Sequence, residues 1–137
     1  MIVTEESLHE AFWAVTRRLR EQTKRALEPW GVSPSQFRAL NVLLTHGEAR
    51  LSTIAAHLRI APRSATEVID GLQDRGLVAR HPDPADRRAT LVTLTDEGRT
   101  TSEAIHAARA TEGERLFSVL NPTDRADLTR ILNRLRA

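Results

Sequence analysis

Apolar side chains recur every three or four residues near both ends of the chain, and this spacing predicts amphipathic helices there. The first stripe runs over residues 8–26 and is interrupted only by Gln22. Pro29 disfavours helix in the residue before it, so we expect this helix to end at residues 28–31. The last stripe follows a start signal at residues 121–124, and its apolar members are Leu128, Ile131, Leu132 and Leu135.

A shorter helix with clear start and stop signals follows the first one. Ser33 is a good N-cap, Pro34 suits the first helical position, and Gln36 completes a capping box. Gly47 supplies the stop signal at the other end. We therefore expect a helix between Ser33 and Gly47, with its apolar stripe formed by Phe37, Leu40, Leu43 and Leu44.

Two short helices joined by a tight connection are predicted next. The first surrounds residues 52–58, and the second opens at Pro62 and closes at Gly76. The connection over residues 59–61 leaves room only for a turn. Two such helices are typical of a helix-turn-helix, although many helical proteins contain similar pairs. The inner face of the second helix comprises Ala65, Val68, Ile69 and Leu72.

The periodicity changes after Gly76. Residues 77–81 and 89–94 predict two strands, the second rich in β-branched side chains, with a polar, proline-rich loop at residues 82–88. Thr95 then caps a long helix that runs towards Leu120. The expected fold class is mainly α with a small two-stranded β wing directly after the helix-turn-helix.

Composition narrows the class of protein. A chain of 137 residues with 40% hydrophobic and 28% charged residues is long enough for one domain with a buried core. The sequence has no cysteine and no apolar run near the roughly 20 residues of a membrane span, and its acidic start is unlike a secretory signal. No metal-ligand motif, phosphate-binding loop or nucleophile constellation is evident. We expect a cytoplasmic protein that is not an enzyme and uses no cofactor.

The small positive charge is concentrated in the middle of the chain. The formal net charge is only +2, and residues 50–90 carry seven Arg against five acidic residues. The other acidic and basic residues balance. The excess is compatible with a polyanion-binding surface, although an excess of two also arises by chance.

The second helix of the pair is asymmetric along its length. Its first turn carries Arg63, Ser64 and Thr66, whereas the acidic residues Glu67, Asp70 and Asp74 come later. The N-terminal residues of such a helix reach base edges in the major groove, and its exposed N–H groups favour phosphate. The acidic residues are expected to point away from DNA or to pair with Arg75 or Arg80.

The central segment resembles the MarR (multiple antibiotic resistance regulator) family of winged helix-turn-helix regulators. The likeness is carried by Pro62–Thr66, Ile69–Leu72 and Arg75–Val78, and most specifically by Asp83–Arg88 with Leu94–Gly98. By this resemblance Asp86 orders the wing and Arg88 reaches the minor groove near its tip. Ala85 departs from the family, which often has a polar or charged residue there.

The resemblance extends over essentially the full length and implies a single MarR-like domain at residues 1–137. Residues 1–30 and 96–137 would form N- and C-terminal dimerisation helices, and residues 33–95 the winged helix-turn-helix DNA-binding lobe. A two-fold homodimer would then place two recognition helices about one DNA turn apart. The alternative is that both terminal stripes complete the core of a monomer.

The implied function is sequence-specific binding of double-stranded DNA, as a repressor of inverted-repeat operators. The alternative is a protein-interaction module that keeps the winged fold without binding DNA. A histidine-based zinc site has no support from residue spacing, because the five histidines are scattered. The predicted DNA-binding residues are Arg59, Arg63, Ser64, Ala65, Thr66, Arg80, Asp86, Arg87 and Arg88.

The family resemblance also implies a small aromatic or phenolic effector, bound in a cleft beside the dimerisation helices. For each candidate residue, simple core packing is the competing interpretation. The candidates are His9, Phe12, Trp13, Arg17, Trp30 and Phe37.

Overall fold

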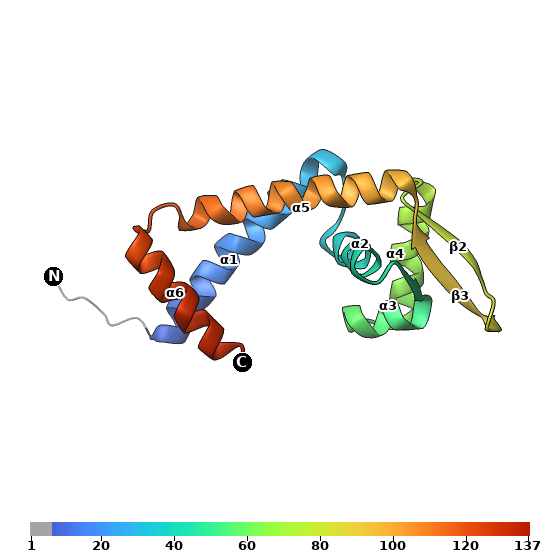
Figure 1. The fold of residues 1–137 in the computed structure, drawn as a ribbon, viewed down its shortest axis with the longest axis horizontal. Coiled ribbons are helices and arrows are strands. Elements are labelled where there is room, and N and C mark those ends of the chain that lie inside the picture. The colour runs from blue at the N-terminus through green and yellow to red at the C-terminus, as the bar shows by residue number, and fades with distance from the viewer. Residues whose placement is uncertain (1–6) are drawn as a thin grey trace. The chain divides into compact units, whose positions relative to one another are not determined.

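The computed structural model describes residues 7–137, and residues 1–6 of the first expected dimerisation segment lie outside the described residues. Figure 1 shows the helices and strands in chain order. The helices are α1 (Leu8–Leu27), α2 (Pro34–His46), α3 (Leu51–Leu58), α4 (Pro62–Asp74), α5 (Asp96–Phe117) and α6 (Pro122–Leu135), with a short 3-10 helix η1 (Glu28–Trp30). The strands are β1 (Glu48–Arg50), β2 (Val78–Asp83) and β3 (Asp86–Leu94).

The chain divides into two compact units. Of the described residues, 7–26 and 108–137 form one unit, called here the terminal unit, and Leu27–Ala107 form the other, the winged unit. The first half of α5 therefore belongs with the winged unit. The expected dimerisation segment at residues 96–137 is thus divided between the two units.

Helix ends fall at the capping residues that the sequence indicated. The Ser33 hydroxyl accepts from the Gln36 N–H at 3.1 Å, and the Gln36 side chain accepts from the Ser33 N–H at 3.0 Å. Gly47 ends α2 with a φ of 82°, a conformation that favours glycine. Asn121 caps α6 by accepting from the Asp124 N–H at 2.8 Å. These local interactions set where the elements begin and end.

The sheet has three antiparallel strands in the order β1-β3-β2, so the expected two-stranded wing gains a third strand. The fully buried Val92 of the central strand β3 pairs with Ala49 on one side and Arg80 on the other. Because β1 connects α2 to α3, the base of the wing is joined to the helix-turn-helix through the sheet.

The predicted loop at residues 82–88 was too long. β2 continues to Asp83 and β3 begins at Asp86, which leaves Pro84 and Ala85 as the turn. Pro82 pairs with Thr90 and is tolerated because β2 is an edge strand, where a missing N–H interrupts no inner ladder. The resulting β2–β3 hairpin projects from the winged unit (Figure 1).

The hydrophobic core of the winged unit draws on every element around the helix-turn-helix. Burial of each large aliphatic side chain contributes about 1.5–3 kcal/mol, so this core fixes α3 and α4 firmly against α2, α5 and the sheet. Its fully buried members include Leu40, Leu43, Ile54, Ile69, Leu72, Val92 and Ile105.

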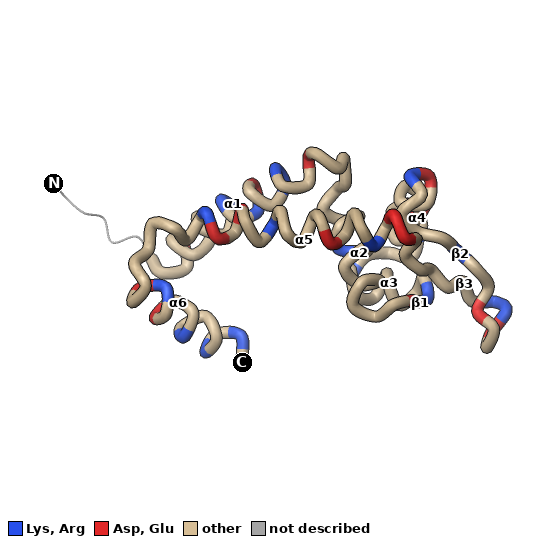
Figure 2. Tube along the Cα trace, turned by 45° about the horizontal axis from the view of Figure 1, so that its top comes forward, with Lys and Arg blue, Asp and Glu red and all other residues tan. Residues whose placement is uncertain are grey.

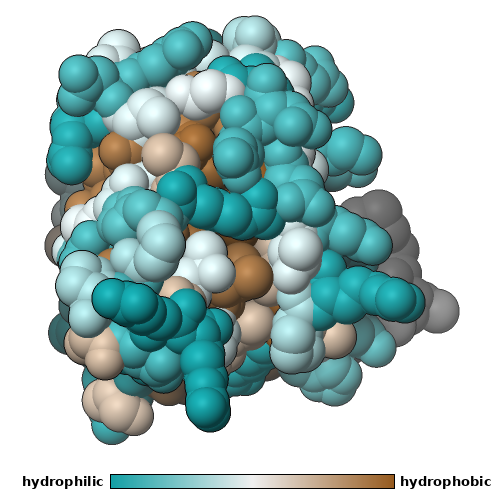
Figure 3. All heavy atoms as spheres, turned by 90° about the vertical axis from the view of Figure 1, so that its right-hand side faces the viewer, coloured by the Kyte–Doolittle hydropathy of each residue, from teal (hydrophilic) through white to brown (hydrophobic). Residues whose placement is uncertain are grey.

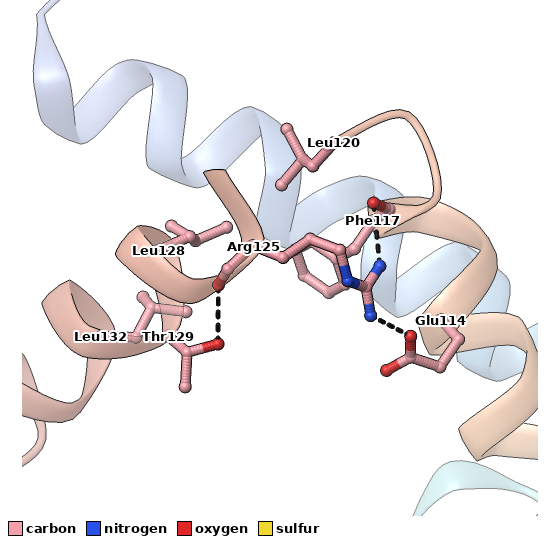
Figure 4. Close-up of a pocket in the computed structure, with 7 residues that line it drawn as sticks. All are labelled: Glu114, Phe117, Leu120, Arg125, Leu128, Thr129 and Leu132. Carbon is pink, nitrogen blue, oxygen red and sulfur yellow. Dashed lines mark hydrogen bonds and ion pairs between the residues drawn. The ribbon is translucent and has the colours of Figure 1, made fainter. Parts of the chain in front are cut away.

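The terminal unit buries far fewer of its apolar side chains than the winged unit does. Among the described residues, its only buried apolar side chains are Ala26 and Leu116, although it holds every exposed large apolar side chain. Arg125 of α6 ties that helix to the end of α5, donating to the Phe117 carbonyl at 3.0 Å and pairing with Glu114 (Figure 4). The exposed apolar residues are Leu8, Phe12, Trp13, Val15, Val119, Ile131 and Leu135.

Candidate nucleic-acid interface

The start of α4 presents the side chains that the sequence singled out. Pro62 occupies the first turn after Ala61, whose methyl group cannot cap the helix, so the first N–H groups receive no side-chain cap. Arg63 is exposed, and Ser64 and Thr66 are half-buried. The Thr66 hydroxyl donates to the Pro62 carbonyl at 3.0 Å and keeps its lone pairs for an incoming donor. A guanidinium, two hydroxyls and the positive helix end therefore occur together.

Ala65 must be removed from the predicted interface. Its side chain has no exposed surface, because it lies on the inner face of α4 and packs into the core of the winged unit. A methyl group without exposed surface cannot contact DNA, so Ala65 positions the helix instead.

Arg80, another predicted DNA-binding residue, makes its side-chain contacts within the protein. Its guanidinium pairs with Asp70 at 2.6 Å and hydrogen-bonds Gln73, both on α4, so it braces β2 against that helix. This confirms the predicted pairing of an α4 acid with Arg80. Arg75, the other candidate partner, donates instead to the carbonyls of Trp30 and Gly31.

Arg59 occupies the turn of the helix-turn-helix in a left-handed conformation, with a φ of 55°. Its N–H donates to the Ala56 carbonyl at 3.2 Å, and the next N–H, of Ile60, reaches the Ala55 carbonyl at 3.1 Å. A side chain in this region costs roughly 1–2 kcal/mol relative to the right-handed form. The exposed guanidinium of Arg59 is thus held at a turn that would suit glycine better.

The free end of the β2–β3 hairpin carries acidic and basic positions together (Figure 2). Asp86 accepts from the Arg88 N–H at 3.0 Å and so orders the turn locally, as the sequence interpretation expected. Arg87 and Arg88 are both exposed. The register passes from the Pro82–Thr90 pair directly to the Asp83–Asp86 pair, so Arg87 and Arg88 lie in an irregular part of the hairpin.

Arg88 lies beside the start of α3. It lines a pocket of about 310 Å³ together with Arg50, Ser52 and Thr90, whereas Arg87 does not. Seen from the hairpin side, most of the visible surface is hydrophilic, with apolar residues between the polar ones (Figure 3). Such a surface suits a charged, hydrated partner.

An ion pair missed by the sequence interpretation joins the hairpin to β1. Asp83 is 7% exposed, and its carboxylate accepts from the Arg50 Nε at 2.8 Å and from the Ala85 N–H at 2.9 Å. The Ala85 N–H foremost, and the Arg50 guanidinium after it, lower the pKa of Asp83 against the opposing effect of burial. Asp83 therefore stays ionised at the end of β2.

The candidate effector residues are only partly brought together. His9, Trp13 and Arg17 line one open hollow on α1, together with Glu10, in the terminal unit. Phe37 is a core residue of the winged unit, 4% exposed, with its ring 5.3 Å from that of His106. Core packing is thus the correct interpretation for Phe37. The other candidates are Phe12, exposed on α1, and Trp30, half-buried in η1.

The described residues 7–137 contain no helix long and apolar enough to cross a membrane. Nor do they contain a group of three or more His, Asp or Glu side chains placed to hold a metal ion.

A helix-turn-helix followed directly by a β-hairpin defines the winged helix-turn-helix class of DNA-binding proteins. Residues 32–90 match the MarR family. The HTH-type transcriptional regulator YkoM of Bacillus subtilis is 30% identical over 128 residues, which cover 93% of this chain and 83% of that protein. The chain therefore belongs to the MarR family and is a DNA-binding transcriptional regulator.

The chain is also similar to a second relative and to solved structures. The HTH-type transcriptional repressor MdtR of B. subtilis is 30% identical over 89% of this chain and 79% of its own length. The crystal structure of wild-type Escherichia coli MarR in its apo form shares the fold, with a TM-score of 0.87, 22% identity and coverage of 97% of this chain and 98% of its own. Bordetella bronchiseptica BpsR, whose DNA binding is regulated by 6-hydroxynicotinic acid, has a TM-score of 0.76 and 26% identity, covering 99% and 97% of the two chains.

Proposed function

We propose that the protein is a cytoplasmic, homodimeric repressor that binds inverted-repeat operators. In this proposal α4 enters the major groove with Arg63, Ser64 and Thr66, while the hairpin reaches the adjacent minor groove with Arg88. The observation that carries it is the first turn of α4, which presents these polar side chains and a positive helix end, in a unit whose hairpin exposes two arginines. The relative MdtR is a transcriptional repressor, which supports the proposal that this protein represses transcription.

Dimerisation is supported by the terminal unit. Exposed apolar side chains on α1 and α6, such as Phe12 and Ile131, would be covered by the same helices of a second chain. Sedimentation at micromolar concentration is expected to give about twice the 15.3 kDa of one chain. A compact monomer under these conditions would remove the two-fold geometry from the proposal.

Selection of bound sequences from random duplexes tests the DNA-binding mode. We expect an inverted repeat with half-site centres roughly 10 bp apart, because two-fold symmetry is imposed on the duplex. Binding to random duplexes should also weaken steeply with salt, as phosphate contacts release counterions. A protein-interaction module that had lost DNA binding would show no salt-dependent binding to any duplex.

We further propose a small aromatic anion as effector, bound at the hollow on α1. There Trp13 offers a half-exposed ring for stacking, Arg17 offers a cationic donor, and His9 offers a ring nitrogen on the same helix. The regulation of BpsR by 6-hydroxynicotinic acid supports this class of ligand. Titration with that acid should quench Trp fluorescence and release DNA, and Trp13→Phe should lose the quenching, whereas Trp30→Phe should retain it. Undiminished quenching in Trp13→Phe would place the ligand elsewhere.

A further inference from the structure

Asp83 is unusual because it is a buried carboxylate at the end of a hairpin whose other tip residues are exposed. The backbone N–H of Ala85 occupies one of its oxygens at 2.9 Å. The Arg50 Nε and Nη2 occupy the other, at 2.8 and 2.7 Å. Both oxygens therefore have partners, and the more distant partner lies 33 residues away in the sequence.

The position of Arg50 allows this ion pair to restrain the hairpin relative to α3. Arg50 is the last residue of β1 and the N-cap residue of α3, so it stands where the sheet joins the helix-turn-helix. β1 pairs with β3 only as far as the Arg50–Leu91 pair. Among the described residues, Thr90 and Asp86, farther out on β3, pair only with Pro82 and Asp83 of β2, and the register is irregular between these two pairs. The Arg50–Asp83 pair links this outer part of the hairpin to α3.

Arg88 lies on the outer part of β3 and lines the same pocket as Arg50 and Ser52. Without the link, the hairpin end would sample many positions, and ordering it on DNA would cost conformational entropy. We propose that Arg50 and Asp83 are positioning residues for DNA binding, which fix the wing so that Arg88 and α4 engage one duplex together. This inference rests on the proposed contact of Arg88 with DNA.

Asp83→Asn separates this role from simple electrostatics. Removing a negative charge from a DNA-binding surface should leave affinity unchanged or raise it. Loss of the link should instead lower operator affinity, and we expect a decrease of roughly tenfold, within the range for a lost wing contact. The matched control is Asp74→Asn, which neutralises an exposed acid of α4 in the same unit and should not lower affinity.

A double-mutant cycle tests whether Asp83 acts through Arg88. In an Arg88→Ala background, Asp83→Asn should change affinity by less than about twofold, because the positioned group is already gone. Arg50→Ala should weaken binding in the native background and add little to Asp83→Asn. Hydrogen exchange should accelerate at the Ala85 and Arg88 amides in Asp83→Asn, while core amides of α2 stay protected.

Two results would overturn the inference. The first is operator binding by Asp83→Asn as tight as that of the native protein. The second is an equal loss of affinity in the Arg88→Ala background. Arg50 is 43% exposed, so Arg50→Ala replaces Asp83→Asn should the latter fail to fold. It is then measured in the native and Arg88→Ala backgrounds, because the effect of a lost link disappears without Arg88 whereas that of a lost phosphate contact persists. Absence of salt-dependent DNA binding by the native protein would be a different outcome, because it would reject the proposed function itself.

Discussion

Gly98 lies so close to the carbonyl of Leu77 that a Cβ at residue 98 would stand 1.8 Å from the Leu77 oxygen. The same junction is held by hydrogen bonds from Thr95, whose N–H donates to the Leu77 carbonyl at 3.1 Å and whose hydroxyl donates to the Gly76 carbonyl at 2.6 Å. The first turn of α5 therefore packs directly against the backbone that leads into β2.

Gly98→Ala should destabilise the protein by about 1–3 kcal/mol, because the new methyl group must displace backbone rather than a flexible side chain. Gly113→Ala is the matched control on the same helix. A methyl group added there would meet open space, so this substitution should stabilise by about 0.5–1 kcal/mol through helix propensity. Chemical denaturation measures both, and equal effects of the two substitutions would contradict the close packing at Gly98.

Arg88→Ala should weaken operator binding more than Arg87→Ala, by about 1–3 kcal/mol, because Arg88 is the guanidinium that we place in the minor groove. The difference should be larger on sites with A·T-rich flanks, where a narrow groove concentrates negative potential. Binding isotherms on matched duplexes measure this, and thermal stability should change little because both side chains are exposed. The reverse order of the two variants would assign the contact to Arg87.

Arg59→Gly should separate stability from DNA binding. Glycine relieves the left-handed strain at residue 59, so the free energy of unfolding should stay level or rise by up to about 1 kcal/mol. Loss of the guanidinium should lower DNA affinity. Arg59→Ala, which keeps the strain, should lose the same affinity without the gain in stability. Native affinity in both variants would exclude Arg59 from the interface.

The lowered pKa of Asp83 predicts an acid-dependent contribution to stability. Its ordinary value is 3.8, and the folded value lies below it, so the contribution is complete above the ordinary value and is lost as the pH falls through the folded one. The difference in unfolding free energy between the native protein and Asp83→Asn should be constant from pH 7 to about pH 5 and shrink in stronger acid. A difference that grew on acidification would show that the pKa of Asp83 is raised.

Features set by neighbouring residues were predictable from the sequence. Ser33, Gly47 and Thr95 act on backbone groups within a few positions, so the helix boundaries they mark could be located without knowledge of the fold. The exposed first turn of α4 followed in the same way from Pro62 and the residues after it.

Features that depend on distant partners were not predictable. β1 has three residues, too few for a periodicity, and it exists because its backbone pairs with β3. The sequence allowed Arg80 either to bind DNA or to pair with an acid of α4, and only the fold places Asp70 beside it. Nothing in the sequence relates Arg50 to Asp83, because their contact arises only when β1 and the hairpin strands come together in one sheet.

The two-residue turn at Pro84 and Ala85 offers a site for a reporter. Both residues are exposed, and the chain contains no cysteine, so Ala85→Cys would introduce a single thiol. A fluorophore attached there would label the hairpin tip specifically, with no background cysteines to remove first. The anisotropy and emission wavelength of the fluorophore would then report changes in the mobility and environment of the hairpin tip as DNA or effector is added.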